Sequence, residues 1–352
     1  MRSAEVVAFG KPLELRQRPT PVPHGSEVLI RVRAAGVCHS DLHLWQGSYD
    51  LGGGKVLSVR DRGIVPPFTL GHEIAGEVAA LGPDADGGLS IGQRGVVYPW
   101  AGCGHCAVCR RGDEQLCIHP RYLGIHVPGG YSDFVLIPHA RYLVDFGDLP
   151  PETAAPYACS GLTAFSALRK IRDDVLAREP ILLVGAGGLG LMALALLRGL
   201  GGFGAVVADI DPRKRAAASA RGALGVVDPN APGALRQARS LLGGGAAAAL
   251  DFVGSAATAR FGLDALVKGG SYVIVGLYGG EITLSLPTIP WRALSIHGAC
   301  VGSLAELRDL ATLVQAGRVA PPPIECRPLE DASLVLDDLD NGRVVGRAVL
   351  KP

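Results

Sequence analysis

A glycine-rich turn between an apolar run and an apolar helix constrains the fold more than any other feature of this chain. Ile181 to Val184 predicts a buried strand, Gly185-Ala186-Gly187-Gly188-Leu189-Gly190 follows it directly, and Leu189 to Leu197 predicts a helix. Further buried strands are predicted at residues 205–208, 247–253 and 271–275. Because helices separate these strands, the pattern is typical of an α/β fold with a doubly wound parallel sheet.

The glycine turn also predicts a dinucleotide site. Glycines at this spacing let the backbone approach a pyrophosphate, and the start of the following helix supplies amide donors. Asp209 ends the next strand, about where the ribose-binding carboxylate of such sites stands, and it would repel a 2′-phosphate. We therefore expect NAD in preference to NADP.

Two alternatives stay open at this site. The run Arg213-Lys214-Arg215 would tolerate an extra phosphate, although a solvated helix face is the simpler interpretation. The turn itself is also compatible with a strand-to-helix connection that binds no ligand. The candidate cofactor contacts from this region are Gly185, Gly187, Gly188, Leu189, Gly190, Asp209 and Lys214.

Four cysteines with short spacings predict a structural metal centre. Cys103, Cys106, Cys109 and Cys117 lie close enough along the chain to surround one ion with thiolates. Zinc with four sulfur ligands has no open position, so such a site shapes a loop and does no chemistry. The alternative is a pair of disulfides, which fits poorly because the other cysteines are scattered and no signal peptide is evident.

Charge and hydropathy exclude several classes of partner. The chain has 352 residues, and 34 basic and 33 acidic side chains give a net charge of +1. This balance gives no general attraction to nucleic acid or to an anionic membrane. Apolar residues make up 48% of the chain, but no run of about 20 spans a bilayer. We expect a cytoplasmic protein whose partners are small molecules.

The pattern of predicted strands and helices changes near Pro150 and again near Gly298. The first part has short β-rich segments such as 28–32 and 74–78 between glycines and prolines, which predicts an irregular β domain. A helix is predicted from Pro151 to about Arg172. The tail predicts helices at 304–314 and 331–339 and a strand at 348–350. We assign residues 1–158 and 299–352 to one domain and 159–298 to the dinucleotide-binding domain.

A second metal centre is a weaker prediction. The segments Cys38-His39-Ser40-Asp41-Leu42-His43 and Gly71-His72-Glu73 stand beside strands, and Cys159 follows the change of pattern near Pro150. Two thiolates and one imidazole would leave the fourth position of zinc open, as catalysis requires. Taken singly, each residue is better explained as a small core residue or a structural histidine.

Taken together and in this order, these motifs resemble the zinc-dependent medium-chain alcohol dehydrogenases over nearly the whole chain. The resemblance implies a GroES-like irregular β-barrel domain around an inserted Rossmann domain. It implies hydride transfer between a primary or secondary alcohol and NAD, giving an aldehyde or ketone. It also implies two zinc ions per chain and assembly as a homodimer or homotetramer.

The resemblance assigns roles to particular residues. It makes Cys38, His72 and Cys159 the ligands of the catalytic zinc, with Glu73 as a transient ligand and Asp41 orienting His72. Ser40 would take the alcohol proton and His43 would pass it outward. Thr163 would pack near the nicotinamide, and His39 and Arg347 would contact the cofactor phosphates.

Rival interpretations remain. Polyol dehydrogenases share the fold that the resemblance implies, but they usually carry a glutamate at the position of Cys159. Zinc-free quinone reductases lack the cysteine motifs. A non-catalytic, zinc-stabilised nucleotide-binding protein is the alternative outside enzymes. The segment from Gln46 to Pro67 is interpreted as a long loop that serves as a substrate lid or a subunit contact, and Trp45, Tyr98 and Trp100 are candidate pocket walls.

Overall fold

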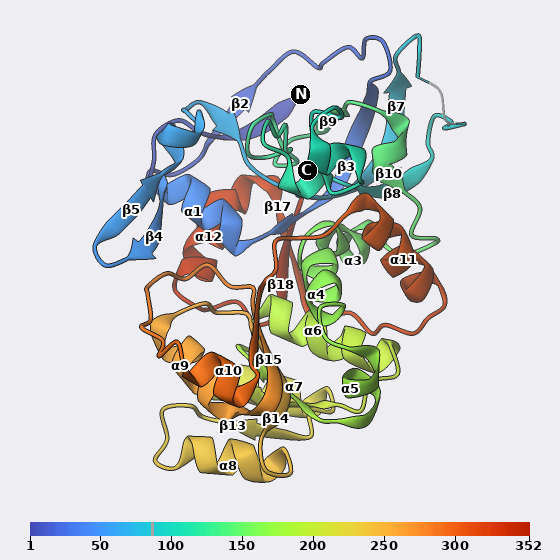
Figure 1. Ribbon diagram of the computed structural model, residues 1–352. Coiled ribbons are helices and arrows are strands. Elements are labelled where there is room, and N and C mark those ends of the chain that lie inside the picture. Colours follow the sequence, from blue (N-terminus) through green and yellow to red (C-terminus); the bar gives the residue numbers. More distant parts are fainter. Residues whose placement is uncertain (86–87) are drawn as a thin grey trace.

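The computed structural model describes residues 1–85 and 88–352, which form two lobes (Figure 1). The strands are β1 Arg2–Val6, β2 Glu14–Gln17, β3 Val28–Val37, β4 Ser48–Gly52, β5 Lys55–Ser58, β6 Phe68–Thr69, β7 Glu73–Leu81, β8 Arg94–Val97, β9 Phe134–Ile137, β10 Leu143–Val144, β11 Ile181–Val184, β12 Ala205–Ala208, β13 Gly225–Val227, β14 Ala246–Asp251, β15 Leu266–Ile274, β16 Ser295–Gly298, β17 Ile324–Pro328 and β18 Arg347–Lys351. The α-helices are α1 His39–Gln46, α2 Ala107–Arg110, α3 Pro151–Ala154, α4 Ser160–Leu168, α5 Asp173–Arg178, α6 Gly188–Gly199, α7 Pro212–Ala220, α8 Ala234–Leu241, α9 Ala256–Ala265, α10 Thr288–Arg292, α11 Leu304–Gln315 and α12 Ala332–Asp340. Within this part of the chain, every helix is too short or too polar to cross a bilayer.

The lower lobe is built on a six-stranded parallel sheet of order β13-β12-β11-β14-β15-β16. Side chains alternate across β11, so Ile181 and Leu183 share a core with α6 and α7, whereas Leu182 and Val184 share one with α8 and α9. Helices on both faces bury the central strands β11, β12 and β14, which explains their continuous apolar sequences, whereas the edge strand β16 is largely exposed. The predicted doubly wound parallel sheet is confirmed.

The upper lobe holds an irregular antiparallel sheet that recruits the end of the chain. Its strands follow the order β10-β8-β7-β3-β18-β17, and β9 also pairs with β3. β18 pairs with β3 through Ala348 and Val37, and β17 runs parallel beside it. The last strand therefore lies in the same sheet as the strand that leads into the Cys38 segment (Figure 1).

The predicted continuous helix from Pro151 to about Arg172 is wrong. The chain forms α3, then a 3-10 helix at Ala155–Ala158, and α4 starts only after Cys159, whose φ and ψ are −129° and −69°. Pro156 has no N–H to donate to the preceding turn, so the α-helical hydrogen bonding of α3 cannot run on. This interruption gives Cys159 its own place between two helices.

The segment from Gln46 to Pro67 is more ordered than a long loop. β4 and β5 form an antiparallel hairpin in which Ser48 faces Ser58, and a 3-10 helix follows at Val59–Arg62. Gly52 has a φ of +81°, and a Cβ there would lie 2.5 Å from the backbone of Gly280. The hairpin tip therefore reaches across to the lower lobe.

Candidate active site

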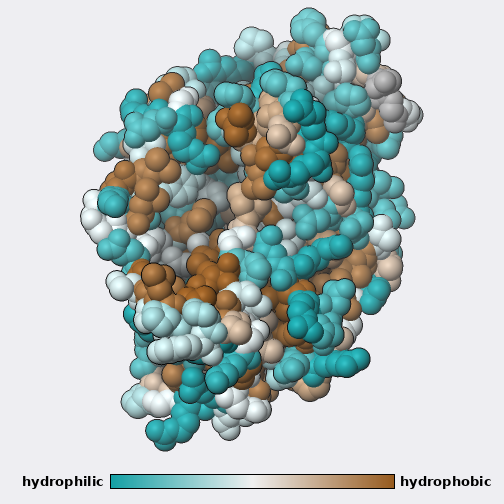
Figure 2. All heavy atoms as spheres, in the orientation of Figure 1, coloured by the Kyte–Doolittle hydropathy of each residue, from teal (hydrophilic) through white to brown (hydrophobic). Residues whose placement is uncertain are grey.

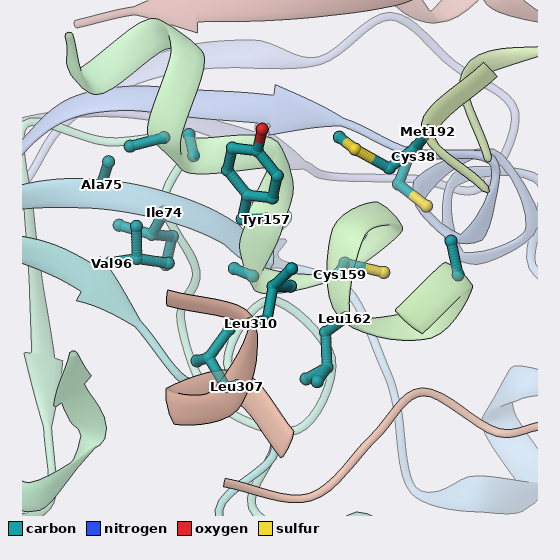
Figure 3. Packing of buried hydrophobic residues seen from close by; sticks show 14 of the residues in the cluster. Cys38, Ile74, Ala75, Val96, Tyr157, Cys159, Leu162, Met192, Leu307 and Leu310 are labelled. Carbon is teal, nitrogen blue, oxygen red and sulfur yellow. The ribbon is translucent and has the colours of Figure 1, made fainter. Parts of the chain in front are cut away.

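Three side chains from distant parts of the chain form one buried cluster. Cys38 follows β3 and precedes α1, His72 precedes β7, and Cys159 precedes α4. Their ligand atoms all lie within 4.8 Å of one another, and the three residues are buried. In Figure 3 the sulfur atoms of Cys38 and Cys159 point toward the same space from different elements. The structure thus brings together the three residues that the resemblance names as zinc ligands.

The imidazole of His72 is held from behind by a buried carboxylate. Its Nδ1 lies 3.2 Å from Oδ1 of Asp41, an ion-pair contact without hydrogen-bond geometry, while Nε2 is buried and has neither a hydrogen bond nor an ion pair among the described residues. Asp41 also accepts hydrogen bonds from the backbone N–H of Cys38 at 2.9 Å and from the hydroxyl of Tyr131 at 3.1 Å. A metal ion would supply the missing partner of Nε2, and a carboxylate behind a ligating histidine is a common way to orient it.

The chemistry of Cys38 also fits a metal ion, whereas the hydrogen bond with Cys38 and burial raise the pKa of the Cys159 thiol, so that a bound metal ion would be needed to hold it as a thiolate. The hydrogen bond with Cys159 and the neighbouring His72 hold the pKa of the Cys38 thiol well below its usual range. The thiolate is the form that binds zinc. Two thiolates and one imidazole make three protein ligands, which is the ligand number of a zinc site with an open fourth position.

Glu73 and Arg347 form a buried ion pair between this cluster and the glycine turn. Oε1 of Glu73 accepts a hydrogen bond from the backbone N–H of Ser160 at 3.0 Å, and Oε2 pairs with Arg347. Burial raises the pKa of Glu73 to about 7, against the opposing effect of Arg347. A Cβ on Gly188 would lie 2.6 Å from Cδ of Arg347, so the arginine contacts the turn directly. It has the position, beside the turn, that a phosphate contact needs.

The predicted proton-relay residues lie on α1, next to the cluster. The hydroxyl of Ser40 is 3.8 Å from the sulfur of Cys38. The His43 ring lies against Tyr49 of β4, with centroids 4.6 Å apart, and burial lowers the pKa of His43. Desolvation also lowers the pKa of His39, and the positive charges of Arg347 and Lys214 lower it further. His39 therefore faces a positively charged region that suits phosphates.

The glycines of the turn have distinct roles. A Cβ on Gly190 would lie 1.8 Å from the carbonyl oxygen of Gly185, so close packing of helix on strand requires glycine there. Gly185 itself has a φ of +93°. A Cβ on Gly187 would meet nothing within 4 Å, which leaves space for a ligand at the start of α6, where Leu189 stands in the first turn. This arrangement fits a pyrophosphate on the helix N-terminus.

The groups expected to contact the rest of the cofactor lie around this turn. The carboxylate of Asp209 accepts hydrogen bonds from the backbone N–H groups of Ala186 at 2.7 Å and of Asp211 at 2.8 Å. In the basic run, Arg213 and Arg215 pair with acids, whereas the described residues offer Lys214 no ion pair. Oγ1 of Thr163 is buried without a hydrogen-bond partner among the described residues. It is therefore available to a bound molecule.

The four-cysteine segment forms a separate cluster. All four thiols are free, and the Sγ atoms are separated by 3.4 Å for Cys106 and Cys109, by 3.9 Å for Cys106 and Cys117 and by 4.0 Å for Cys103 and Cys109. Zinc–sulfur bonds of about 2.3 Å in a tetrahedron would separate the sulfur atoms by about 3.8 Å. A disulfide would require about 2.05 Å. The geometry matches one metal ion and contradicts the disulfide alternative.

The three aromatic candidates for the pocket wall have different surroundings. Tyr98 is buried and donates a hydrogen bond to the carbonyl of Gly302, and the indole N–H of Trp45 donates to the carbonyl of Lys11. Trp100 lies against His72 with ring centroids 5.3 Å apart, and its indole N–H donates to the carbonyl of Ala158. Trp100 therefore lies beside a metal ligand, and the pocket role of the other two stays a prediction.

The sequence interpretation missed two tyrosines at the site. Tyr122 packs edge-on against Trp100 at 5.4 Å and donates a hydrogen bond to the carbonyl of Gln115, inside the four-cysteine segment. Tyr131 supports Asp41. Neither tyrosine belongs to a motif, so nothing in the local sequence indicates its role.

On the face of the molecule seen in Figure 2, the space-filling view shows a hollow between the two lobes, with apolar side chains at its rim.

Two family models match the chain. Residues 24–148 match the alcohol dehydrogenase GroES-like domain, and residues 188–316 match the zinc-binding dehydrogenase domain. These matches confirm the expected irregular β domain of the GroES-like type in the N-terminal part.

Named proteins match over essentially the whole chain. An NAD-dependent alcohol dehydrogenase of Sulfurisphaera tokodaii is 38% identical over 354 residues, which cover 100% of both chains. A D-arabinose 1-dehydrogenase (NADP(+)) of Saccharolobus solfataricus is 32% identical and is covered to 97%, with 100% of this chain. The crystal structure of an alcohol dehydrogenase from Aeropyrum pernix superposes with a TM-score of 0.89 at 31% identity, with 100% of both chains covered.

Proposed function

Because the chain belongs to the zinc-binding, medium-chain alcohol dehydrogenase family, we propose that it oxidises primary or secondary alcohols with NAD at Cys38, His72 and Cys159. The observation that carries this proposal is the orphaned Nε2 of His72, buried within 4.8 Å of two sulfur atoms. Zinc bound there would supply a Lewis acid that lowers the pKa of the alcohol hydroxyl. A second zinc at the four cysteines would do no chemistry.

The protein's own residues provide the path for the proton. Oγ of Ser40 lies beside the cluster and receives the hydroxyl proton of the alcohol, and His43 stands one helical turn further along α1. The lowered pKa of His43 keeps its imidazole neutral near pH 7, so it can accept that proton and release it to solvent. Once the hydroxyl oxygen has lost its proton, the carbon that bears this oxygen would give up its hydrogen as a hydride to the nicotinamide, leaving an aldehyde or ketone.

The cofactor is oriented by the groups around the glycine turn. The start of α6 receives the pyrophosphate, His39 and Arg347 add positive charge, and the carboxylate of Asp209 accepts the ribose hydroxyls. Its negative charge opposes a 2′-phosphate, which favours NAD. Thr163 packs beside the nicotinamide, where its unpartnered hydroxyl supports this position.

The hairpin of β4 and β5 acts as a lid in this proposal. It places Tyr49 on the ring of His43 and rests its tip against Gly280 of the lower lobe. A closed hairpin would exclude water from the space around the reacting carbon. A subunit contact through the same hairpin is the alternative.

A sugar or polyol substrate is the second candidate function. The similarity to a D-arabinose 1-dehydrogenase favours it, while the thiolate at position 159, in place of a glutamate, favours simple alcohols. A non-catalytic nucleotide-binding protein is the third alternative.

Metal analysis and an activity screen separate these functions. We expect two zinc ions per chain and formation of NADH with primary, secondary, benzylic or cyclic alcohols, and little with D-arabinose or sorbitol. One zinc ion per chain and no turnover with any of these substrates would support the binding protein instead. Turnover confined to sugars would support the second function.

We also propose that the chain assembles with itself as a homodimer or homotetramer. β16 is the edge strand of the six-stranded sheet and carries Ile296, which is 42% exposed. Trp291 of the neighbouring α10 is 78% exposed. Exposed apolar side chains beside an open strand edge are typical of protein interfaces. Light scattering of the purified protein would measure the assembled mass.

A further inference from the structure

A cavity of about 640 Å³ lies between α6, α7 and the segment 317–323, which leads into β17. Small apolar side chains form much of its wall, among them Ala195 and Ala217. Cavities of roughly 300 to 1,000 Å³ are typical of sites for small ligands. None of the residues discussed above as metal ligands or cofactor contacts lines this cavity, so the proposed reaction leaves it unexplained.

All charged residues that line the cavity are arginines. They are Arg198 in the last turn of α6, Arg221 at the end of α7, and Arg318, and no acidic residue of the described ranges 1–85 and 88–352 lines the same wall. Among the described residues, no carboxylate forms an ion pair with any of the three. The walls therefore combine three positive charges with no compensating negative side chain.

The arginines are only partly satisfied by the protein. One N–H of Arg198 donates to the carbonyl of Arg221 at 2.9 Å, and one N–H of Arg221 donates to the carbonyl of Pro321 at 2.8 Å. Each guanidinium has five N–H donors, so most of them are left to solvent or to a bound molecule. The described residues give the side chain of Arg318 no hydrogen bond.

Burial affects one of the three charges, because Arg198 and Arg318 are exposed. Arg221 is partly buried, and burial lowers the pKa of its guanidinium, with no neighbouring acid to oppose the effect. The ends of α6 and α7 lie nearby, and their carbonyl groups offset some of the positive charge. Single carbonyl oxygens do not match the paired N–H groups of a guanidinium, which bind planar, two-oxygen acceptors best. An anion with several oxygens would match them.

We propose that this cavity binds a phosphorylated small molecule, with the three arginines on its phosphate and the alanines against its organic part. Arginine is preferred to lysine where phosphate is held by paired hydrogen bonds. Three cations suit a phosphate, which carries close to two negative charges at pH 7, better than a carboxylate. The site is independent of alcohol oxidation and would exist even if the proposed reaction were wrong.

A molecule bound in this cavity would contact segments that lead to both lobes. α6 starts at the glycine turn and carries Arg198 in its last turn, while residues 317–323 lead to the strand pair β17 and β18 of the upper lobe. A ligand that contacts both would hold the two lobes together. Binding to the folded state would also stabilise the protein.

Calorimetric titration with phenyl phosphate tests the proposal on the full-length protein, saturated with NADH so that the dinucleotide site is filled. We expect saturable binding at one site per chain, and weaker binding of inorganic phosphate because it cannot contact the alanines. Arg318→Gln should weaken phenyl phosphate binding at least about tenfold, which corresponds to one lost charge-assisted contact. Arg221→Gln should weaken it as well.

Arg236→Gln is the matched control, because Arg236 is exposed on α8 and does not line the cavity. It removes the same charge and should leave the affinity unchanged. Circular dichroism verifies that each variant is folded, and Arg318→Gln keeps the test valid if Arg221→Gln unfolds. Absent binding, equal binding by wild type and Arg318→Gln, or equal weakening by Arg236→Gln would overturn the proposal. Equal affinity for phenyl phosphate and inorganic phosphate would contradict the role of the alanines.

Discussion

The two cysteine clusters of this protein are assembled in opposite ways. The four-cysteine cluster lies within residues 103–117, and two of its members are partly exposed. The three-ligand cluster draws Cys38, His72 and Cys159 from segments far apart in the chain, and each is buried. A short segment can wrap a metal ion largely by itself, whereas the second cluster exists only when β3, β7 and α4 are in place. The four-cysteine cluster therefore depends mainly on local structure, whereas the three-ligand cluster depends on the whole fold.

The same contrast separates stability from chemistry. Four thiolates fill the coordination of zinc, and three ligands leave one position for a reacting molecule. A series of side-chain contacts nevertheless joins the two clusters. Tyr122 bonds the carbonyl of Gln115 in the four-cysteine segment and packs on Trp100, which packs on His72. We expect this link to transmit only a small effect.

The largest effect is expected at the three-ligand cluster. Cys38→Ser removes a thiolate ligand and should lower kcat/KM by at least about 10³-fold, or about 4 kcal/mol, because the Lewis acid is lost. The affinity for NADH, measured by fluorescence titration, should stay nearly unchanged because the glycine turn is intact. If the variant instead lost stability while its remaining folded molecules kept normal turnover, the roles of the two clusters would be exchanged.

The four-cysteine cluster should respond in stability. Cys109→Ser should lower the free energy of unfolding by about 2–4 kcal/mol, because bound metal contributes to folding. Urea unfolding measures this change, and kcat per folded molecule should change less than about twofold. The exposed Cys326→Ser is the control and should alter neither quantity. Loss of turnover at unchanged stability would contradict the assignment.

A substitution at His43 distinguishes the contribution of proton transfer to turnover from that of metal binding. His43→Gln should slow alcohol oxidation about 10- to 30-fold, or about 1.4–2 kcal/mol, while zinc content stays the same. Because burial lowers the pKa of His43, wild-type activity should be present above this pKa and should fall as the pH drops through it. A pH profile of kcat/KM should lack this limb in the variant.

Two controls accompany that profile. Added imidazole should partly restore turnover in His43→Gln, because a soluble base can take over the proton. The exposed His24→Gln should leave the profile unchanged. An unaltered acid limb in His43→Gln would remove His43 from the relay.

The smallest effect is expected at the link between the clusters. Tyr122→Phe removes the hydroxyl that bonds Gln115 but keeps the ring on Trp100, and should raise KM for benzylic alcohols about 2- to 5-fold, or about 0.5–1 kcal/mol. The value of kcat should not change. Tyr142→Phe removes a similar bond, to Glu114, away from Trp100, and should leave KM unchanged. Equal effects of both variants would mean that the link is not specific.

How far the sequence predicts each region follows from the distance over which residues interact. The strand at Ile181 to Val184 and the glycine turn before the next helix are local patterns, and the structure contains both. The four-cysteine spacing is local as well. By contrast, the pairing of Glu73 with Arg347 joins residues that are 274 positions apart, and no local pattern indicates it.

The errors have the same cause. The apolar run after Pro151 favours one helix, but Pro156 interrupts the hydrogen bonding and leaves Cys159 between two helices. The segment from Gln46 to Pro67 lacks a clear strand period, so its hairpin was not predicted. The buried cluster of Cys38, His72 and Cys159 could be expected only from a resemblance, because its geometry depends on the packing of both lobes.

Cobalt substitution tests the central claim most directly, because the visible spectrum of Co²⁺ reports changes in its ligands. We predict that the spectrum of the cobalt-loaded protein changes when NADH and an unreactive alcohol analogue are added, through the open position beside Cys38, His72 and Cys159. The change should vanish in Cys38→Ser and persist in Cys109→Ser. A spectrum that does not respond in the wild type, or a response that persists in Cys38→Ser and is lost in Cys109→Ser, would contradict the account.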